Sequence, residues 1–268
     1  MTEQAKRDPQ EPMGRDPIAR ALRILRFIGE HDGGPLGVRE IASSLGMQPS
    51  TVFRTLSQLT AESLVRKEPE TSHYTLGLEL LRLGQLASAK FNVADVADAH
   101  MRSITANSNE AVFLGLYERE RQQMFVAKAI PSTHPLRYHI ERDRWLDVFR
   151  AASGLAILAF LPTEERDGIL AKADSVATER TPWLRRERLE ETLEEVRQKG
   201  YSCTQGWNTP GAVGIAAPVF NGRQVIGDLF MTIPVFRFNE NQGDELAQLV
   251  VTAAANLTNE LGGRPQDS

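Results

Sequence analysis

The first third of the chain carries apolar residues at helical spacing. They recur every three or four positions over residues 18–28, 38–45 and 52–59, which predicts three amphipathic helices with these residues facing inward. The breaker Gly33-Gly34-Pro35 separates the first two helices. Gly46 can adopt a positive φ and Pro49 suits a first helical position, so we expect a tight turn between the second and third helices.

Two short extended segments follow the third predicted helix. Residues 64–67 and 73–76 are typical of strands, and the turn-forming residues 68–72 lie between them. Three helices followed by such a hairpin predict a winged helix-turn-helix. The competing interpretation is a small helical cap with a solvated polar face, which the helix order, the tight turn and the hairpin together disfavour.

The outward face of the third predicted helix has the chemistry of a DNA-binding surface. Hydroxyls and amides near a helix N-terminus can contact phosphates and base edges. An arginine can donate two parallel hydrogen bonds to a guanine edge. The side chains of this face are Ser50, Thr51, Arg54, Thr55 and Gln58.

The charge distribution fits a basic module on an acidic body. The whole chain has a formal net charge of −4, which by itself argues against nucleic acid as a partner. Residues 15–67, however, carry eight basic side chains against five acidic ones. Arg20 and Arg39 in this segment, and His73 in the second predicted strand, are further candidate DNA contacts.

Residues 78–104 continue with a helical pattern. The first part, which begins at Leu78, is apolar on nearly all sides, with Leu80 and Leu81 on different faces. A single chain would have difficulty burying all of that surface. We therefore expect this helix to pack against a second subunit as well as its own domain.

From residue 111 the pattern changes to strands in hairpins with helices between them. Asn221-Gly222, between two apolar runs, is the strongest hairpin signal. Hairpins with helices outside them predict an α+β domain around a mostly antiparallel sheet. The expected strands are residues 111–117, 124–130, 136–140, 212–220 and 224–233, and the expected helices are residues 152–161, 189–200 and 246–261.

Length and composition indicate a folded, soluble, two-domain protein. The chain has 268 residues, of which 41% are apolar and 25% charged. Its single cysteine, Cys203, excludes an internal disulfide and fits a cytoplasmic protein; we expect it to be buried. No export or membrane segment is expected. The expected division is a disordered tail (1–16), a winged helix-turn-helix domain (17–77), a helix (78–92), an α+β domain (93–262) and a second tail (263–268).

Several segments resemble the IclR family of bacterial transcription regulators. The N-terminal stretches are ALRIL, REIASSLGMQPSTVFRTLSQL and LVRKEPETSHYTLGLELLRLG, and the C-terminal ones include HPLR, SGLAILAFLP, PGAVGIAAPVF and VIGDLFMTIP. By element order the resemblance covers residues 17–261. It implies a winged helix-turn-helix joined by a linker helix to a GAF-like effector-binding domain with an antiparallel sheet.

The resemblance also implies partners. These are a double-stranded DNA operator near a catabolic gene cluster, a small-molecule effector, and other copies of the chain in a dimer or tetramer. By the family's pattern Ser50, Thr51 and Arg54 lie on the recognition helix, with Gln48 at its mouth. Pro49 stands where many members have lysine, which removes one potential phosphate contact.

The positions that match effector-binding residues of the family are less polar here than in members that sense small oxo-acids. Gly214 replaces a frequent cysteine, and Phe230 and Thr232 replace two frequent serines. We therefore expect an aromatic acid or amide as the effector, with Arg137, His139 or Thr232 at its polar end. Core packing is an equally good explanation of each large aromatic residue. The remaining candidates are Phe149, Ala152, Ser153 and Trp207.

Two other functions compete with this interpretation. A catalytic GAF-like domain has little support, because the histidines form no metal-binding pattern, Cys203 has no histidine nearby in sequence, and no nucleophile or phosphate-binding motif occurs. We expect no cofactor, metal or catalytic residue. A winged helix that binds protein instead of DNA stays open, because fold alone does not settle function.

Overall fold

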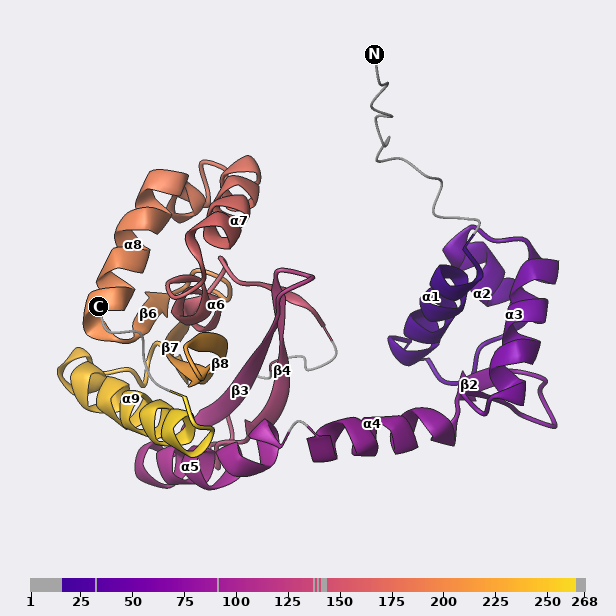
Figure 1. Cartoon of the computed structure of the whole chain (residues 1–268), viewed down its shortest axis with the longest axis horizontal. Coiled ribbons are helices and arrows are strands. Elements are labelled where there is room, and N and C mark those ends of the chain that lie inside the picture. The colour runs from indigo at the N-terminus through magenta and orange to yellow at the C-terminus, as the bar shows by residue number, and fades with distance from the viewer. Residues whose placement is uncertain are drawn as a thin grey trace, which may run out of the picture. The chain divides into compact units, whose positions relative to one another are not determined.

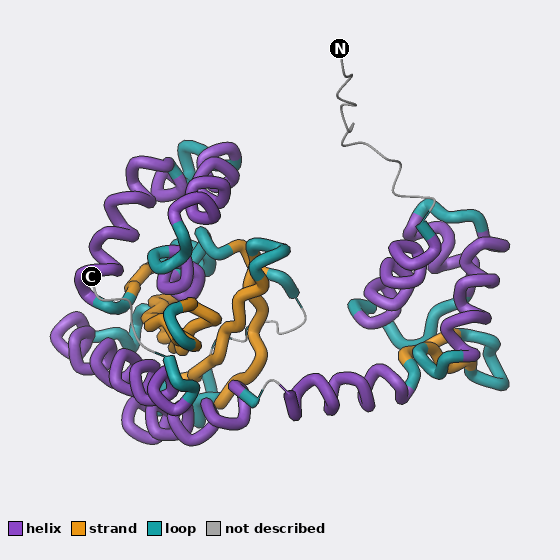
Figure 2. Tube along the Cα trace, viewed as in Figure 1, coloured by secondary structure: helices purple, strands orange, loops and turns teal. Residues whose placement is uncertain are grey.

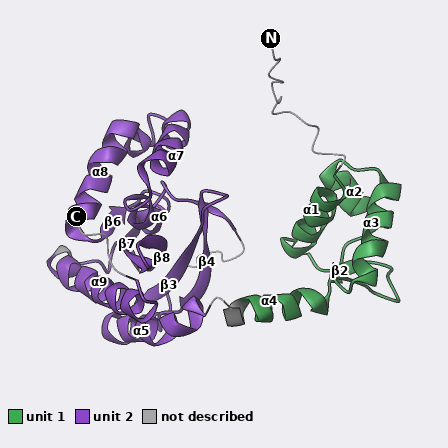
Figure 3. Ribbon diagram, viewed as in Figure 1, with its two compact units in different colours: residues 1–91 green, residues 92–268 purple. Residues whose placement is uncertain are grey.

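The computed structural model describes residues 16–31, 33–90, 92–136, 138, 140 and 144–263 (Figure 1). The predicted tails lie outside these residues except for Asp16 and Gly263. The chain divides into two compact units, Met1–Phe91 and Asn92–Ser268 (Figure 3). Each unit has its own core.

The first unit begins with the three predicted helices, α1 (Pro17–Gly29), α2 (Val38–Leu45) and α3 (Pro49–Ala61). Asp16 caps α1 by accepting a hydrogen bond from the backbone N–H of Ile18 at 2.8 Å. Gly46 ends α2 with φ +63°, a left-handed conformation that glycine adopts without a steric penalty. The tight turn between α2 and α3 is therefore confirmed.

The inward face of α1 differs from the prediction. Ile24 and Ile28 are buried in the three-helix core, whereas Ile18 and Leu22 are 70% and 45% exposed. α1 carries apolar residues on two faces, and the narrow core of this unit has room for only one of them. Helical spacing alone could not tell which face would be buried.

The predicted hairpin is also present. β1 (Val65–Lys67) and β2 (Tyr74–Leu76) pair antiparallel. Leu36 joins them through an antiparallel bridge to Tyr74. The three helices and this hairpin form the winged helix-turn-helix that the sequence predicts.

Helix α4 (Leu78–Lys90) completes the first unit. Its leucines are largely unburied, with Leu78 and Leu81 exposed by 78% and 60%, and Leu83 and Leu86 by 44% and 49%. Among the described residues of the first unit, none covers this apolar face. The expectation that a second subunit packs against it stays a prediction.

The second unit is built on a six-stranded sheet in the order β5-β4-β3-β8-β7-β6. Every neighbouring pair in it is antiparallel. The predicted hairpins β3–β4 and β7–β8 are confirmed, and β3 and β8 join them at the centre. The strands are β3 (Ala111–Glu118), β4 (Gln123–Ile130), β5 (Leu146–Asp147), β6 (Ser202–Gln205), β7 (Ala212–Asn221) and β8 (Gln224–Pro234).

Helices cover both faces of this sheet (Figure 2). On one face lie α5 (Val93–Ser108) and α9 (Gly243–Glu260). On the other lies the fully buried α6 (Ala152–Leu158), packed in turn against α8 (Arg186–Lys199), which contacts α7 (Thr163–Ser175). Two short 3-10 turns occupy Pro182–Leu184 and Glu240–Gln242. The α+β class with an antiparallel sheet is confirmed.

Two expectations for this unit were wrong. The described residues of segment 136–140 are not in a strand, and the Leu136 carbonyl instead accepts a hydrogen bond from the Arg237 guanidinium at 2.8 Å. Cys203 is exposed because it points outward from the edge strand β6. Partial desolvation raises the pKa of its thiol, which is the opposite of what a nucleophilic cysteine needs.

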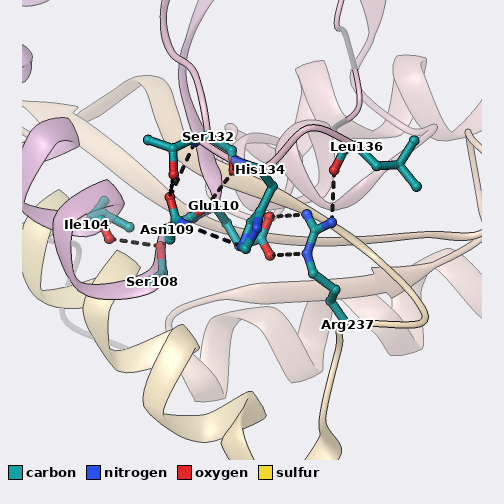
Figure 4. Close-up of polar contacts among 9 residues, drawn as sticks. Ile104, Ser108, Asn109, Glu110, Ser132, His134, Leu136 and Arg237 are labelled. Carbon is teal, nitrogen blue, oxygen red and sulfur yellow. Dashed lines mark hydrogen bonds and ion pairs between the residues drawn. The ribbon is translucent and has the colours of Figure 1, made fainter.

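An ion pair between a partly buried arginine and a buried glutamate holds three loops of the second unit together (Figure 4). Arg237, between β8 and α9, donates to both carboxylate oxygens of Glu110 at 2.9 and 2.8 Å. Asn109, next to Glu110, accepts a hydrogen bond at its backbone carbonyl from the Ser132 hydroxyl. These contacts join the start of β3 to the segment after β4 and to the turn before α9.

Candidate DNA-binding surface and ligand cavity

The outward face of α3 is polar and accessible. Ser50, Arg54 and Gln58 are exposed, and Thr51 is half-buried. Gln48 is the N-cap residue, and because its side chain makes no capping bond it stays available to a partner. Arg54 forms no ion pair with a carboxylate of the described chain, so its guanidinium is not committed to an internal contact.

One predicted member of this face points the other way. Thr55 is buried, and its hydroxyl donates to the Thr51 carbonyl at 3.0 Å within the helix. Phe53, which was not predicted, is 53% exposed on the same helix. Thr55 therefore belongs to the core side of α3.

The other three predicted DNA contacts differ in their surroundings. Arg39 is exposed on α2. Arg20 on α1 is half-buried, and its Nε has no hydrogen-bond partner among the described residues. The His73 ring is held in the wing, where Nδ1 lies 2.9 Å from the Thr71 carbonyl.

The second unit contains a cavity of about 360 Å³ beside α6 and the ends of β7 and β8. Its volume lies within the range of small-molecule sites. The predicted residues on its wall are Ala152, Ser153, Trp207, Gly214, Phe230 and Thr232. The predicted residues on this wall come from α6, β7, β8 and the segment after β6, and the fold brings them together.

Of the other predicted effector residues, one lies away from this wall and two are outside the described part of the chain. Phe149 is 1% exposed and packs in the core, so it is a core residue and not a lining residue. Arg137 and His139 lie outside the described residues.

The start of α6 is held in place by hydrogen bonds at the back of the cavity. Thr204 on β6 accepts a hydrogen bond at its hydroxyl from the Ala152 N–H at 3.1 Å, and the Ser202 hydroxyl donates to the Ala152 carbonyl. Gly214 leaves room for this helix, because a Cβ there would lie 3.2 Å from the Ala152 methyl group. The lining between α6 and β7 is therefore tightly packed.

Aromatic rings give the cavity a largely apolar wall. Phe230 stacks on Phe113 with ring centroids 5.0 Å apart. Trp207 stacks on Trp183 at 5.7 Å. Neighbouring rings restrict both side chains, so the wall is largely preformed.

Sequence reasoning missed the polar groups on the remaining wall. Arg150 lines the cavity and lies 3.2 Å from Asp147, which also accepts from Lys172 at 2.9 Å. Partial burial alone would raise the pKa of Asp147, but hydrogen bonds from Lys172, Gln123 and Arg150 lower it. The sequence signal was the position of Arg150, directly before the segment that begins α6.

The described residues give no support to a metal site or to a membrane-spanning helix. In this part of the chain no group of His, Cys, Asp or Glu side chains is placed to hold a metal ion. None of its helices is long and apolar enough to cross a membrane.

Comparison with known protein families decides the identity. The model described as bacterial transcriptional regulator IclR C-terminal matches residues 85–259, and the IclR helix-turn-helix domain matches residues 17–69. The chain belongs to the IclR family. It is a ligand-responsive transcriptional regulator with a DNA-binding helix-turn-helix domain, and not an enzyme.

Individual IclR-family relatives agree with this assignment. The HTH-type transcriptional regulator KdgR of Dickeya chrysanthemi is 29% identical over 254 residues, covering 94% of this chain and 82% of the relative. The transcriptional repressor IclR of Escherichia coli is 23% identical over 247 residues, covering 92% and 90%. An IclR regulator from Alicyclobacillus acidocaldarius has a crystal structure with 25% identity, a TM-score of 0.80 and coverage of 94% and 100%.

A further crystal structure shares the fold. It is an IclR homologue from Microbacterium hydrocarbonoxydans complexed with 4-hydroxybenzoate, with 21% identity and a TM-score of 0.79. It covers 92% of this chain and 99% of its own.

Proposed function

We propose that this regulator controls a catabolic gene cluster in the cytoplasm and responds to an aromatic acid or amide. The observation that carries the proposal is the cavity of the second unit, whose wall combines the rings of Phe230 and Trp207 with a set of polar side chains that includes Arg150 and Thr232. Such a wall suits a flat apolar ring better than a two- or three-carbon acid. Arg150, a cation on this wall, can pair with a ligand carboxylate, and Thr232 can donate a hydrogen bond.

The fold neighbour from Microbacterium hydrocarbonoxydans gives limited support, because its structure holds 4-hydroxybenzoate while its sequence shares only 21% identity with this chain. That protein of the same fold is complexed with an aromatic acid. The proposal for this chain therefore rests on the side chains that line its own cavity.

On the DNA side, we propose that α3 enters the major groove and that Ser50, Thr51, Arg54 and Gln58 contact the operator, with Gln48 at the helix entrance. Arg39 on α2, Arg20 on α1 and His73 in the wing are proposed as flanking contacts. The exposure of most of these polar groups supports this arrangement.

Self-association is part of the same proposal. Leu78 and Leu81 on α4, together with Ile18 and Leu22 on α1, expose apolar surface that a second copy can cover. A dimer would place two α3 helices on half-sites separated by about 34–36 Å or a multiple of that spacing. A ligand then changes operator affinity only if it binds two arrangements of the dimer unequally.

The test of DNA binding is a gel shift and footprint on the DNA upstream of the neighbouring genes. Arg54→Ala should weaken operator binding by about 1 to 3 kcal/mol and relax the preference at one base position. Arg188→Ala, which removes an exposed arginine from α8 in the other unit, is the matched control and should change nothing. Unchanged affinity and footprint for Arg54→Ala would remove it from base recognition.

The test of the effector is a thermal-shift screen of aromatic acids and amides against two- and three-carbon acids. A ligand at a hundredfold excess over its Kd stabilises the protein by about 2.7 kcal/mol. Tighter binding of a small acid than of every aromatic compound would refute the aromatic assignment. Absence of any salt-sensitive, sequence-dependent gel shift would favour a winged helix that binds protein.

A further inference from the structure

A buried carboxyl group in the central strand β8 makes no well-formed hydrogen bond. Asp228 is 0% exposed, and neither of its carboxyl oxygens has a hydrogen bond of normal geometry among the described residues, although the Ser153 hydroxyl lies close enough to favour its charged form. Buried polar groups in folded proteins are nearly always hydrogen-bonded, so an exception requires an explanation. Burial away from any cation disfavours the charged form, so the pKa of Asp228 is raised well above its usual value and the neutral carboxylic acid is favoured.

The sheet is built to make room for this carboxyl group. Asp228 pairs with Gly115 on β3, and a Cβ at Gly115 would collide with Oδ1 of Asp228. The β3–β4 register shifts between Leu114 and Gly115, at the same point in the sheet. A group without a well-formed hydrogen bond thus occupies space that a glycine leaves open.

The carboxyl group lies behind the wall of the ligand cavity. Asp228 is on the same face of β8 as Phe230 and Thr232, both of which line the cavity. The terminal carbon of Met124, another lining residue, would lie 2.5 Å from the same Cβ at Gly115, so it is a close neighbour of the carboxyl group.

Two side chains of the cavity wall near Asp228, Ser153 and Met124, are held only weakly. The Ser153 hydroxyl donates to the sulfur of Met124 at 3.2 Å, which is a weak hydrogen bond. The unbranched side chain of Met124 can change rotamer at low cost. A change of the Met124 rotamer is therefore the movement that a ligand contact with Asp228 requires.

We propose that Asp228 is a specificity-determining residue of this cavity and that it pairs with a primary carboxamide on an aromatic ligand. This inference rests on the proposed aromatic effector and narrows it from an acid or amide to an amide. The neutral carboxyl group donates through its O–H and accepts through its C=O. A primary carboxamide presents the complementary C=O and N–H, so two parallel hydrogen bonds satisfy both oxygens of Asp228.

Other end groups complete this pairing less well. A ligand carboxylate would bring a charge into a buried site where the only carboxyl partner is itself an acid. A methyl ketone has the acceptor but lacks the N–H donor, and therefore leaves one oxygen of Asp228 unpaired. The carboxamide is neutral and supplies both groups.

The experiment uses the full-length protein with benzamide, acetophenone and benzoate as probes, and measures Kd by calorimetry. Acetophenone has the shape of benzamide with methyl in place of the amino group. The wild-type protein should bind benzamide at least about tenfold more tightly than either of the others. Asp228→Asn keeps one donor and one acceptor and should retain this preference, whereas Asp228→Leu should abolish it.

A melting experiment without ligand separates this role from a structural one. Asp228→Leu, which approximates the shape of the side chain, should melt at or above the wild-type temperature because it removes an unpaired group. The control is Thr258→Val, which should melt lower because the buried Thr258 hydroxyl accepts from the Phe220 N–H at 3.1 Å. A clear loss of stability in both Asp228→Leu and Asp228→Asn would show a structural role and overturn the proposal.

The remaining outcomes are also decisive. If acetophenone or benzoate binds the wild-type protein as tightly as benzamide, the assignment of Asp228 fails while the aromatic effector survives. If the benzamide preference persists in Asp228→Leu, another residue recognises the amide and the assignment again fails. If none of the three probes binds, the aromatic effector and the role of Asp228 fail together.

Discussion

Removing Arg237 should destabilise the second unit far more than removing a surface arginine. The side chains of Glu110 and Arg237 are only 7% and 19% exposed. Arg237→Met would leave the Glu110 carboxylate buried without its cation. It would also remove the hydrogen bond to the Leu136 carbonyl, which is 2.8 Å long.

The expected loss of unfolding free energy follows from those contacts. Removing one partner of a buried pair and one further charged hydrogen bond should together cost about 4 to 6 kcal/mol. The control, Arg102→Met, breaks an ion pair to Asp98 in which the arginine is 65% exposed, and should cost less than about 1 kcal/mol.

Urea unfolding followed by tryptophan fluorescence measures this difference. The three tryptophans, Trp145, Trp183 and Trp207, all lie in the second unit, so the signal reports on that unit alone. Glu110→Gln combined with Arg237→Met should recover more than half of the loss, because no carboxylate is then left unpaired. If Arg237→Met costs no more than Arg102→Met, the pair does not hold these loops together.

Three further variants test separate parts of the molecule. Leu81→Asp places a charge on the apolar face of α4 and should lower both the sedimentation coefficient and operator affinity; an unchanged oligomer would exclude this face as the interface. Gly46→Val forces a β-branched residue to φ +63° and should destabilise the first unit by about 1 to 3 kcal/mol in circular dichroism melts, whereas Gly84→Ala, in an open part of α4, should not. The pKa of Asp147 is lowered in the folded state, so its ion pairs stabilise the second unit above the unfolded pKa of about 4 and lose that effect as the pH falls further. The difference in unfolding free energy between the wild type and Asp147→Asn should therefore disappear in acid. A difference that does not depend on pH would contradict this.

Much of the fold could be predicted because local signals and tertiary packing agree. Gly46, Pro49 and the Asn221-Gly222 turn each act through their own backbone preferences, so their elements formed where expected. The buried face of α1 could not be predicted in the same way. Ile18 and Ile24 are equally apolar, and only the packing of α2 and α3 decides that Ile24 is buried.

The candidate sites show the same limit. Six cavity residues were found through their motifs, but Phe149 was misplaced because an aromatic residue near a cavity can equally well belong to the core. Thr55 was assigned to the DNA face because helical spacing places it at the border between the two sides of α3. Asp228 did carry a signal, a charge within the apolar run of residues 225–234, although its unpaired state emerges only from the packed sheet.

The order of strands in the sheet has a consequence for synthesis of the protein. Its central pair joins β3 to β8, with Ala111 opposite Thr232, so these partners leave the ribosome far apart in time. The first unit consists of one contiguous segment and can fold as soon as that segment emerges. A nascent chain therefore acquires its DNA-binding domain well before it can close the sheet that carries the ligand cavity.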